Sequence, residues 1–333
     1  MTSGAIRSIL AACAVACALA LSPARANDSA AALDAGGLVL VRDPDITLAS
    51  EDLRIGLDRI AVDYVFRNGA ATAKTLRIAF PLPAIDGAQL STSALSLPFE
   101  DRANFVGFTV TVDGVPVTPQ LEERAYLGQR EVTDLLKRHG LPLNPLRRND
   151  LEAAVKRLKP AAQQELVKAG LMSDPAEMPE FLWRSEAKFH WEQNFPPGRE
   201  LRVSHTYVPV KGNHLLAADE AKTPAYRARY CLDDDGLAGV RRLIAASPMK
   251  DQGLTRAVEV PYIVTTARNW AGRIGRFTLT VDKGSPTALV SFCRKGVRKT
   301  GPTTFVWEAK DYVPDADLRI LIVANDDALL GIR

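Results

Sequence analysis

The chain has 333 residues, of which 47% are hydrophobic, a proportion that supports packed cores and excludes intrinsic disorder as the default state. Its 42 lysines and arginines nearly balance its 39 aspartates and glutamates, so the net charge of +3 provides no basic field for nucleic acid or an anionic membrane. The length suits two domains of ordinary size.

The first 26 residues have the features of a cleavable signal peptide. Arg7 supplies a positive charge, residues 9–21 form an uncharged apolar run, and Ala24-Arg25-Ala26 places small residues where a signal peptidase reads them. The run is shorter than the roughly 20 residues of a membrane-spanning helix. We therefore expect cleavage after Ala26, no membrane span in the mature chain, and a periplasmic or secreted protein. A retained N-terminal anchor and lipidation of Cys13 are the alternatives, although the apolar run is short for an anchor and continues past that cysteine.

Residues 38–118 combine short apolar runs with turn residues, which is typical of antiparallel strands. Asn68-Gly69 marks one turn, and Asp113-Gly114 is a strong signal for a two-residue hairpin. The predicted strands span residues 38–41, 60–66, 76–80, 105–112 and 115–117.

The hydrophobic period changes after residue 118, and we expect a helical insertion over residues 119–180. Apolar residues at helical spacing predict three helices. Gly140 and Gly170 stand where helices end, and Pro160 stands where one begins.

Strands return at residues 186–195 and 200–210, which Pro196-Pro197-Gly198 is expected to join as a hairpin. A helix is expected over residues 236–246. Further strands are expected at residues 258–266, 276–281, 288–293, 303–307 and 318–323.

These elements predict a mainly β protein of the α+β class, with two antiparallel β-sandwich-like units and a helical insertion in the first. After the signal peptide of residues 1–26, the first unit covers residues 27–212. The second, β-rich unit covers residues 213–333.

Two cysteines, Cys231 and Cys293, remain after removal of the signal peptide. A pair of cysteines in an oxidising compartment favours one disulfide, with two buried free thiols as the alternative. Neither cysteine has a nearby histidine or a Cys-x-x-Cys partner, so the sequence gives no support for a redox role.

His190 and His205 lie on the two arms of the expected hairpin and raise the question of a metal site. Joining the apolar faces of the arms places His190 on the opposite face from His205, because a shift of one residue reverses every side chain. We therefore expect no metal or cofactor, and a partly buried, hydrogen-bonded His205.

Other motifs do not identify a catalytic residue. Asp233-Asp234-Asp235-Gly236 resembles part of a calcium loop. Its spacing, however, places Cys231 and Arg242 at the first and twelfth positions, where such a loop needs an aspartate and a glutamate. A helix N-terminus favoured by negative charge is the simpler interpretation. The chain has no nucleophile elbow, phosphate-binding loop or zinc-protease motif. Three residues are candidates for ligand binding: Trp270, which lies in a predicted loop, His205 and Tyr207. A tryptophan folded over the end of a sheet is the alternative for Trp270.

Several segments, in their order, resemble an exported bacterial family, domain of unknown function 4424. They include Tyr64-Val65-Phe66-Arg67-Asn68, Phe80-Pro81-Leu82-Pro83, His205-Thr206-Tyr207-Val208-Pro209 and Val290-Ser291-Phe292-Cys293. The resemblance covers nearly the whole mature chain and implies no activity. Residues 57–125 are more faintly similar to the vault and inter-alpha-trypsin type β-sandwich domain, which implies a scaffold for protein interaction.

The balance of these features favours a non-enzymatic binding or assembly module that acts on a cell-envelope protein or glycan. The alternative is a periplasmic hydrolase whose site assembles in space, with His205 and an aspartate or glutamate of the helical insertion. No nucleic-acid partner is expected.

Overall fold

The computed structural model describes residues 29–34, 37–40, 43–82, 84–89, 95–96, 99, 103–174 and 179–332. The expected signal peptide, its cleavage site after Ala26, and Cys13 lie outside these residues. The described chain is mainly β with additional helices, as the sequence predicts. Within the same residues, no helix is long and apolar enough to cross a membrane.

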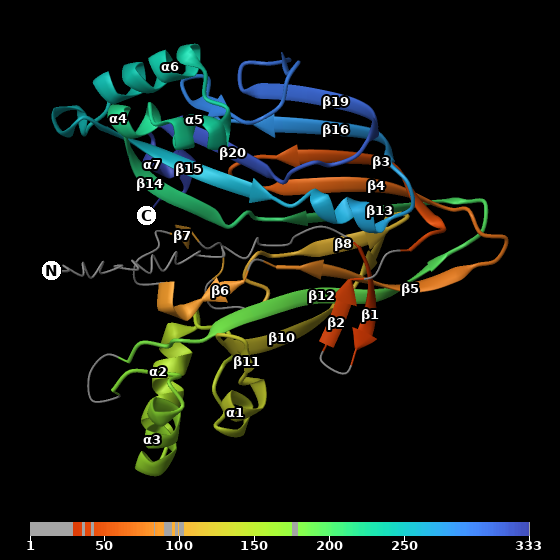
Figure 1. Cartoon of the computed structure of the whole chain (residues 1–333), viewed down its shortest axis with the longest axis vertical. Helices are drawn as coiled ribbons and strands as arrows, with labels where there is room; N and C mark the ends of the chain where they lie inside the picture. Colours follow the sequence, from red (N-terminus) through yellow and green to blue (C-terminus); the bar gives the residue numbers. More distant parts are fainter. Residues whose placement is uncertain are drawn as a thin grey trace, which may run out of the picture.

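Among the described residues, eleven strands precede the first helix of the insertion (Figure 1). They are β1 (Ser29–Asp34), β2 (Gly37–Leu40), β3 (Ile46–Ile55), β4 (Ile60–Asn68), β5 (Lys74–Pro81), β6 (Ile85–Asp86), β7 (Leu95–Ser96), β8 (Thr109–Val112), β9 (Val115–Val117), β10 (Gln120–Leu127) and β11 (Arg130–Glu131).

The insertion contains three helices, and the remaining elements follow it. They are α1 (Thr133–Arg138), α2 (Arg148–Arg157), α3 (Pro160–Lys168), β12 (Arg184–Phe195), β13 (Glu200–Tyr207), β14 (Lys211–Ala217), α4 (Ala218–Ala221), α5 (Pro224–Tyr230), α6 (Asp234–Ala245), β15 (Leu254–Tyr262), β16 (Ile274–Asp282), β17 (Leu289–Ser291), β18 (Arg298–Lys299), β19 (Thr304–Tyr312), β20 (Leu318–Ala324) and α7 (Asp327–Leu330).

The strands form three sheets. Sheet A has the order β11-β10-β12-β5-β1-β2, with β6 beside β12. Sheet B has the order β18-β19-β16-β3-β4-β13-β8-β9, and sheet C has the order β17-β20-β15-β14-β7. Helices α4 to α6 lie beside sheet C near one end of the molecule, and helices α1 to α3 lie beside sheet A near the other end (Figure 1).

Sheet B joins the two halves of the chain, because β16 pairs with β3 in parallel. This pairing departs from the all-antiparallel sandwiches that the sequence predicts. The expected boundary between residues 212 and 213 therefore separates neither two sheets nor two cores. One hydrophobic cluster contains Val62 and Phe80 from before this boundary together with Val260 and Leu279 from after it. Sheet B contains strands from both sides of that expected boundary.

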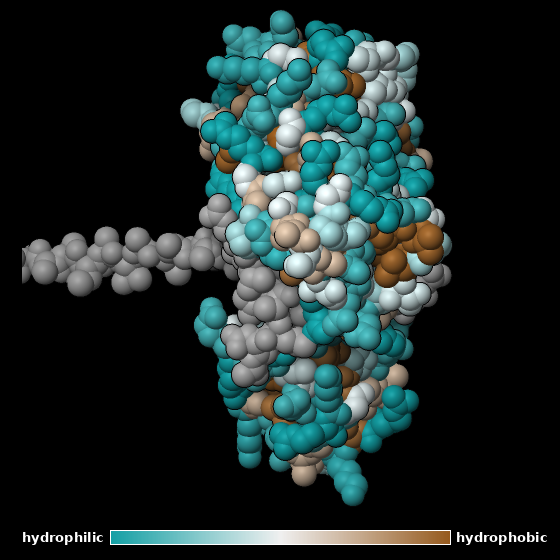
Figure 2. Space-filling model, turned by 90° about the vertical axis from the view of Figure 1, so that its right-hand side faces the viewer, coloured by the Kyte–Doolittle hydropathy of each residue, from teal (hydrophilic) through white to brown (hydrophobic). Residues whose placement is uncertain are grey.

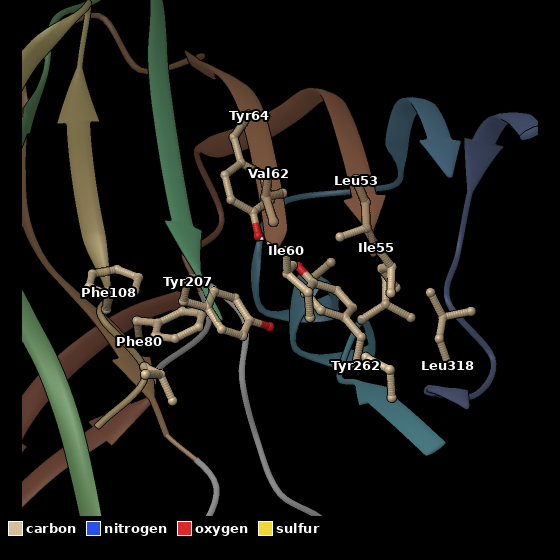
Figure 3. Packing of buried hydrophobic residues seen from close by; sticks show 14 of the residues in the cluster. Leu53, Ile55, Ile60, Val62, Tyr64, Phe80, Phe108, Tyr207, Tyr262 and Leu318 are labelled. Carbon is tan, nitrogen blue, oxygen red and sulfur yellow. Dashed lines mark hydrogen bonds between the residues drawn. The ribbon is translucent and has the colours of Figure 1, made fainter. Parts of the chain in front are cut away.

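Alternation along β4 places its apolar side chains against this shared core. Ile60, Val62, Tyr64 and Phe66 are buried, while the residues between them are partly or fully exposed. Figure 3 shows Val62 and Tyr64 directed toward the cluster, with Tyr262 of sheet C nearby. The hydroxyls of Tyr64 and Tyr262 lie 3.1 Å apart, so this contact links sheets B and C inside the core.

Local turn chemistry explains several connections. Asp113 and Gly114 both have positive φ, as a two-residue hairpin between β8 and β9 requires.

Gly275, within β16, allows this strand to lie close to the irregular part of β3. A Cβ at this position would lie 2.6 Å from the carbonyl oxygen of Ala49.

Two expectations about the first half are wrong. The segments 186–195 and 200–210 do not form a hairpin, because β12 pairs within sheet A and β13 pairs within sheet B. The turn at Pro196-Pro197-Gly198 carries the chain from one sheet to the other. The helical insertion begins at Thr133, later than residue 119, because residues 120–127 form strand β10.

Candidate functional site

His205 is a core residue of the sandwich between sheets A and B. Its side chain is 1% exposed, and its ring centroid lies 4.9 Å from that of Phe80 and 5.4 Å from that of Phe108. These neighbours are aromatic rings of strands and connecting segments, whereas the helical insertion packs in a separate cluster. The geometry therefore presents no entrance for a ligand at His205.

Tyr207 and Trp270 are buried in the same cluster. Tyr207 is 6% exposed and packs against Phe80 at 5.3 Å between ring centroids (Figure 3). Trp270 is 1% exposed and lies 4.7 Å from the ring of Phe66. Trp270 is therefore not an exposed binding residue. Its ring is folded into the core, which is the alternative that the sequence also allowed.

The motifs considered for metal binding have other roles. His190 lies in sheet A and His205 in sheet B, so they do not share a hairpin. Asp233 caps α6, where its carboxylate accepts a hydrogen bond from the backbone N–H of Gly236 at 2.8 Å. The described part of the chain contains no group of three His, Cys, Asp or Glu side chains suited to a metal ion.

The predicted disulfide between Cys231 and Cys293 is formed. Cys231 follows the last residue of α5, and Cys293 lies two residues beyond β17. The bond thereby fastens the helical layer to the edge strand of sheet C.

A buried carboxylate near this disulfide is fully engaged. Glu259 accepts hydrogen bonds from Arg229 at 2.8 Å, from Arg319 at 2.6 Å and from the hydroxyl of Tyr230. Burial raises the pKa of Glu259, but these donors outweigh it and hold the pKa below its usual value. The network joins α5 to sheet C and pairs the carboxylate with two arginines of the protein itself.

A groove with different properties lies where β11 leaves the edge of sheet A and continues into α1, at the end of the molecule occupied by α1 in Figure 1. Its volume is about 570 Å³. Its lining comes from β10, β11 and α1 and combines acidic, basic and apolar side chains: Glu122, Glu123, Arg124, Arg130, Glu131, Val132, Thr133, Asp134, Leu135 and Lys137.

The backbone of β10 is open along this groove. The N–H and C=O of Ala125 point away from β12, because they bond to the Thr133 hydroxyl at 3.0 Å and to the N–H of Val132 at 2.8 Å. Since the direction alternates along a strand, the peptide groups of Leu121 and Glu123 point the same way. Strand β11 pairs only with Tyr126 and Leu127, and no described residue bonds to the outward peptide groups of Leu121 or Glu123.

Glu123 is the carboxylate beside this open backbone. It is half-buried, and none of the described residues forms a hydrogen bond or ion pair with its side chain. Burial raises the pKa of Glu123, and the positive charges of Arg147 and Lys137 oppose that shift only in part. A cationic group entering the groove could form the direct ion pair that no described residue forms with Glu123.

Ion pairs hold the rim of the groove in place. Arg124 donates to Glu122 at 2.7 Å and to Glu131 at 3.0 Å, and the bond with Glu122 is the main cause that raises the pKa of Arg124. Arg130 donates to the carbonyl of Ala169 at 2.9 Å, which connects the rim to the end of α3. The site is therefore largely formed before any ligand arrives.

A strand pattern in the sequence marks this site, although residues 119–180 are predicted to form a helical insertion. Leu121, Ala125 and Leu127 repeat with the two-residue period of a strand, and Glu123 occupies the remaining position of that series. A single polar residue within an apolar face is the feature that marks Glu123.

Comparisons with solved structures show distant likenesses. A Legionella pneumophila protein provisionally described as nutrient binding has 15% identity, with 85% of this chain and 68% of that chain covered and a TM-score of 0.44. An M1 zinc metallopeptidase from Deinococcus radiodurans has 9% identity and a TM-score of 0.27. The matched region includes 85% of this chain and 43% of that enzyme. Such scores carry no argument about activity.

A comparison with curated proteins gives no match. The family described as a domain of unknown function, DUF4424, matches residues 26–321, which is most of the chain. This match agrees with the resemblance seen in the sequence, and the chain belongs to the DUF4424 family.

Proposed function

We propose that this protein is an exported binding module that holds an extended peptide segment of a cell-envelope protein along β10. The observation that carries the proposal is the groove along the open edge of β10, where Glu123 forms no ion pair with any residue that the structure describes. An incoming strand continues the pairing at the point where β11 ends. This mode of recognition, in which a peptide extends a sheet, is common among binding domains.

Export to the periplasm or the exterior is part of the proposal. The disulfide between Cys231 and Cys293 supports it, because such bonds persist in oxidising compartments and are rare in the cytosol. The signal-peptide features of residues 1–26 point the same way.

A peptide fits the groove better than a glycan does. The outward N–H and C=O groups of Leu121 and Glu123 recur at the spacing of a strand, and a peptide backbone presents matching groups at the same spacing. The carboxylate of Glu123 favours a lysine or arginine side chain on the segment, since a half-buried charge is stabilised by an opposite charge. Hydroxyl groups of a sugar offer neither the spacing nor the charge.

The hydrolase alternative has no comparable support. It requires His205 to meet an acidic residue of the helical insertion, but His205 lies among the aromatic rings of the sandwich core. The insertion forms its own apolar cluster around Leu136, Leu151 and Trp183.

The test is selection of random dodecapeptides displayed on phage against the purified mature protein, followed by titration of the enriched peptides. We expect enriched sequences to carry a lysine or arginine. Their affinity should fall about tenfold in E123Q, because a charged contact is replaced by a neutral one. Glu308 of β19 pairs with Arg298 of β18, outside the groove, so E308Q is the matched control and should bind as the natural chain does. Failure to enrich peptides, or equal affinity in E123Q and E308Q, would overturn the proposal.

A further inference from the structure

A second pocket lies near the end of the molecule that carries α6 and β19, away from the β10 groove (Figure 1). Its volume is about 400 Å³. Residues of α6, of the segment between β16 and β17, of β17 and of β19 line it, and they include Arg242, Leu243, Lys283, Leu289, Val290 and Phe305. The lining contains two cations and no acidic residue.

Lys283 is the first unusual feature of this pocket. Its side chain is buried, with the residue 6% exposed, and its ammonium group donates to the backbone carbonyls of Pro286, at 2.8 Å, and Ala288. Both acceptors are neutral, and no described carboxylate pairs with the ammonium group. A buried charge without a counter-charge is costly, so an anion at this position would be stabilised. Burial, together with the neighbouring charge of Lys299, lowers the pKa of Lys283. This lowered pKa and the cost of the unpaired charge both arise because the ammonium group is removed from water.

Arg242 is the second cation. It projects from α6, is exposed, and forms no ion pair or side-chain hydrogen bond with any residue that the structure describes. The terminal nitrogen Nη2 of Arg242 would lie 3.6 Å from a Cβ built on Gly239, so the guanidinium group lies back along the helix toward the pocket. A guanidinium group of this kind suits carboxylate or phosphate oxygens.

The remaining wall is apolar and partly open. Leu243, Leu289, Val290 and Phe305 are all partly exposed, so their side chains are available to an apolar body. Gly239 allows α6 to pack close to β17, because a Cβ there would lie 2.4 Å from Leu289. The pocket thus combines a cationic end with an apolar wall.

We infer that this pocket binds an anionic amphiphile, in which a carboxylate or phosphate group is joined to a short acyl body. The anionic group lies between Arg242 and Lys283, and the acyl body lies against Leu289 and Phe305. Both an anionic phospholipid and a free acyl carboxylate carry this chemistry. The inference is independent of the β10 groove and of its peptide.

Calorimetric titration of the mature protein with octanoate tests the inference. We expect octanoate to bind, acetate to bind much more weakly for lack of an acyl body, and octyl glucoside to fail for lack of charge. The affinity for octanoate should fall about tenfold or more in R242Q. Arg241 is the adjacent exposed arginine of α6 and does not line the pocket, so R241Q is the matched control and should bind normally.

Flotation with vesicles separates the two sources of the ligand. Binding to phosphatidylglycerol vesicles and not to phosphatidylcholine vesicles, lost in R242Q, identifies a lipid as the occupant. Binding of octanoate without binding to either vesicle identifies a free amphiphile. Absence of binding to octanoate and to both vesicles, or equal affinities in R242Q and R241Q, would overturn the inference, because both substitutions leave the packed core untouched.

Discussion

Glu123 acquires its properties from its place on β10. It belongs to the face that carries Leu121 and Ala125, so its carboxylate is half-buried although it reaches the groove. Because burial raises its pKa above the usual 4.5, the folded protein holds the proton more tightly than the unfolded chain does. Ionised Glu123 therefore lowers the free energy of unfolding at neutral pH, and this cost disappears below the pKa of the unfolded chain.

The E123Q variant is expected to be more stable than the natural chain at neutral pH. The difference should shrink as the pH falls through the raised pKa of Glu123 and vanish below about 4.5, where the carboxylate is protonated in both states. Urea unfolding at a series of pH values measures it. A stability difference that is constant with pH would show that desolvation of the charge is not its cause.

His205 is expected to contribute to stability alone. In H205A the aromatic cluster of Phe80, Phe108 and Tyr64 loses a central ring, so the free energy of unfolding should fall by about 2–5 kcal/mol, as for other large-to-small core substitutions. Circular dichroism in urea provides the measurement, and peptide binding at the β10 groove should be retained. Full stability in H205A with loss of binding would place His205 in a functional site.

Sequence patterns identify which residues are apolar and regularly spaced, but not which of them meet. The burial of Trp270 depends on Phe66 and Phe195, which are distant along the chain, and no local pattern reports that contact. By contrast, the disulfide between Cys231 and Cys293 agrees with the prediction made from the two cysteines that lie outside the expected signal peptide.

At the scale of elements, the disulfide joins two segments that are separated by 62 residues. The unfolded chain is constrained by such a loop, which contributes up to about 4 kcal/mol. We expect the C231S/C293S double variant to lose stability by about 2–4 kcal/mol, as measured by thermal and urea unfolding without reductant. Unchanged stability would mean that contacts of α5 with sheet C hold this layer without the bond.

The elements that the sequence predicts correctly have strong local signals. The Asp113-Gly114 hairpin and the alternating strand β4 are examples. The sequence does not distinguish the arch between β12 and β13 from a hairpin, because a proline-glycine turn fits either connection and only the partner strands decide between them. Strand β10 is hard to recognise in the sequence because its charged outer face conceals the apolar alternation.

At the scale of the whole molecule, sheet B makes the two halves depend on each other. The parallel pair of β3 and β16 and the shared hydrophobic cluster connect residues on both sides of position 212. This arrangement could not be derived from the sequence, because a parallel pairing between distant strands leaves no local signal.

We therefore expect the mature chain to unfold in one cooperative transition. Calorimetric and van't Hoff enthalpies should agree, and residues 27–212 expressed alone should not give a folded protein, since their strands β3 and β4 would lose the cover of sheet C. Two separate transitions, or a stable isolated fragment, would show that the halves are independent domains. On the face shown in Figure 2, hydrophilic residues predominate and hydrophobic residues gather in a small patch near one edge.

The most direct test of the account is the affinity of a selected peptide, labelled with a fluorophore, for E123P and E123Q. Proline removes the outward N–H of Glu123 without breaking a bond to β12, whereas glutamine removes the charge and keeps the N–H. We predict that E123P loses peptide binding while E123Q retains weakened binding, with both proteins folded by circular dichroism. Equal affinity in the two variants would contradict the claim that the peptide extends sheet A at β10.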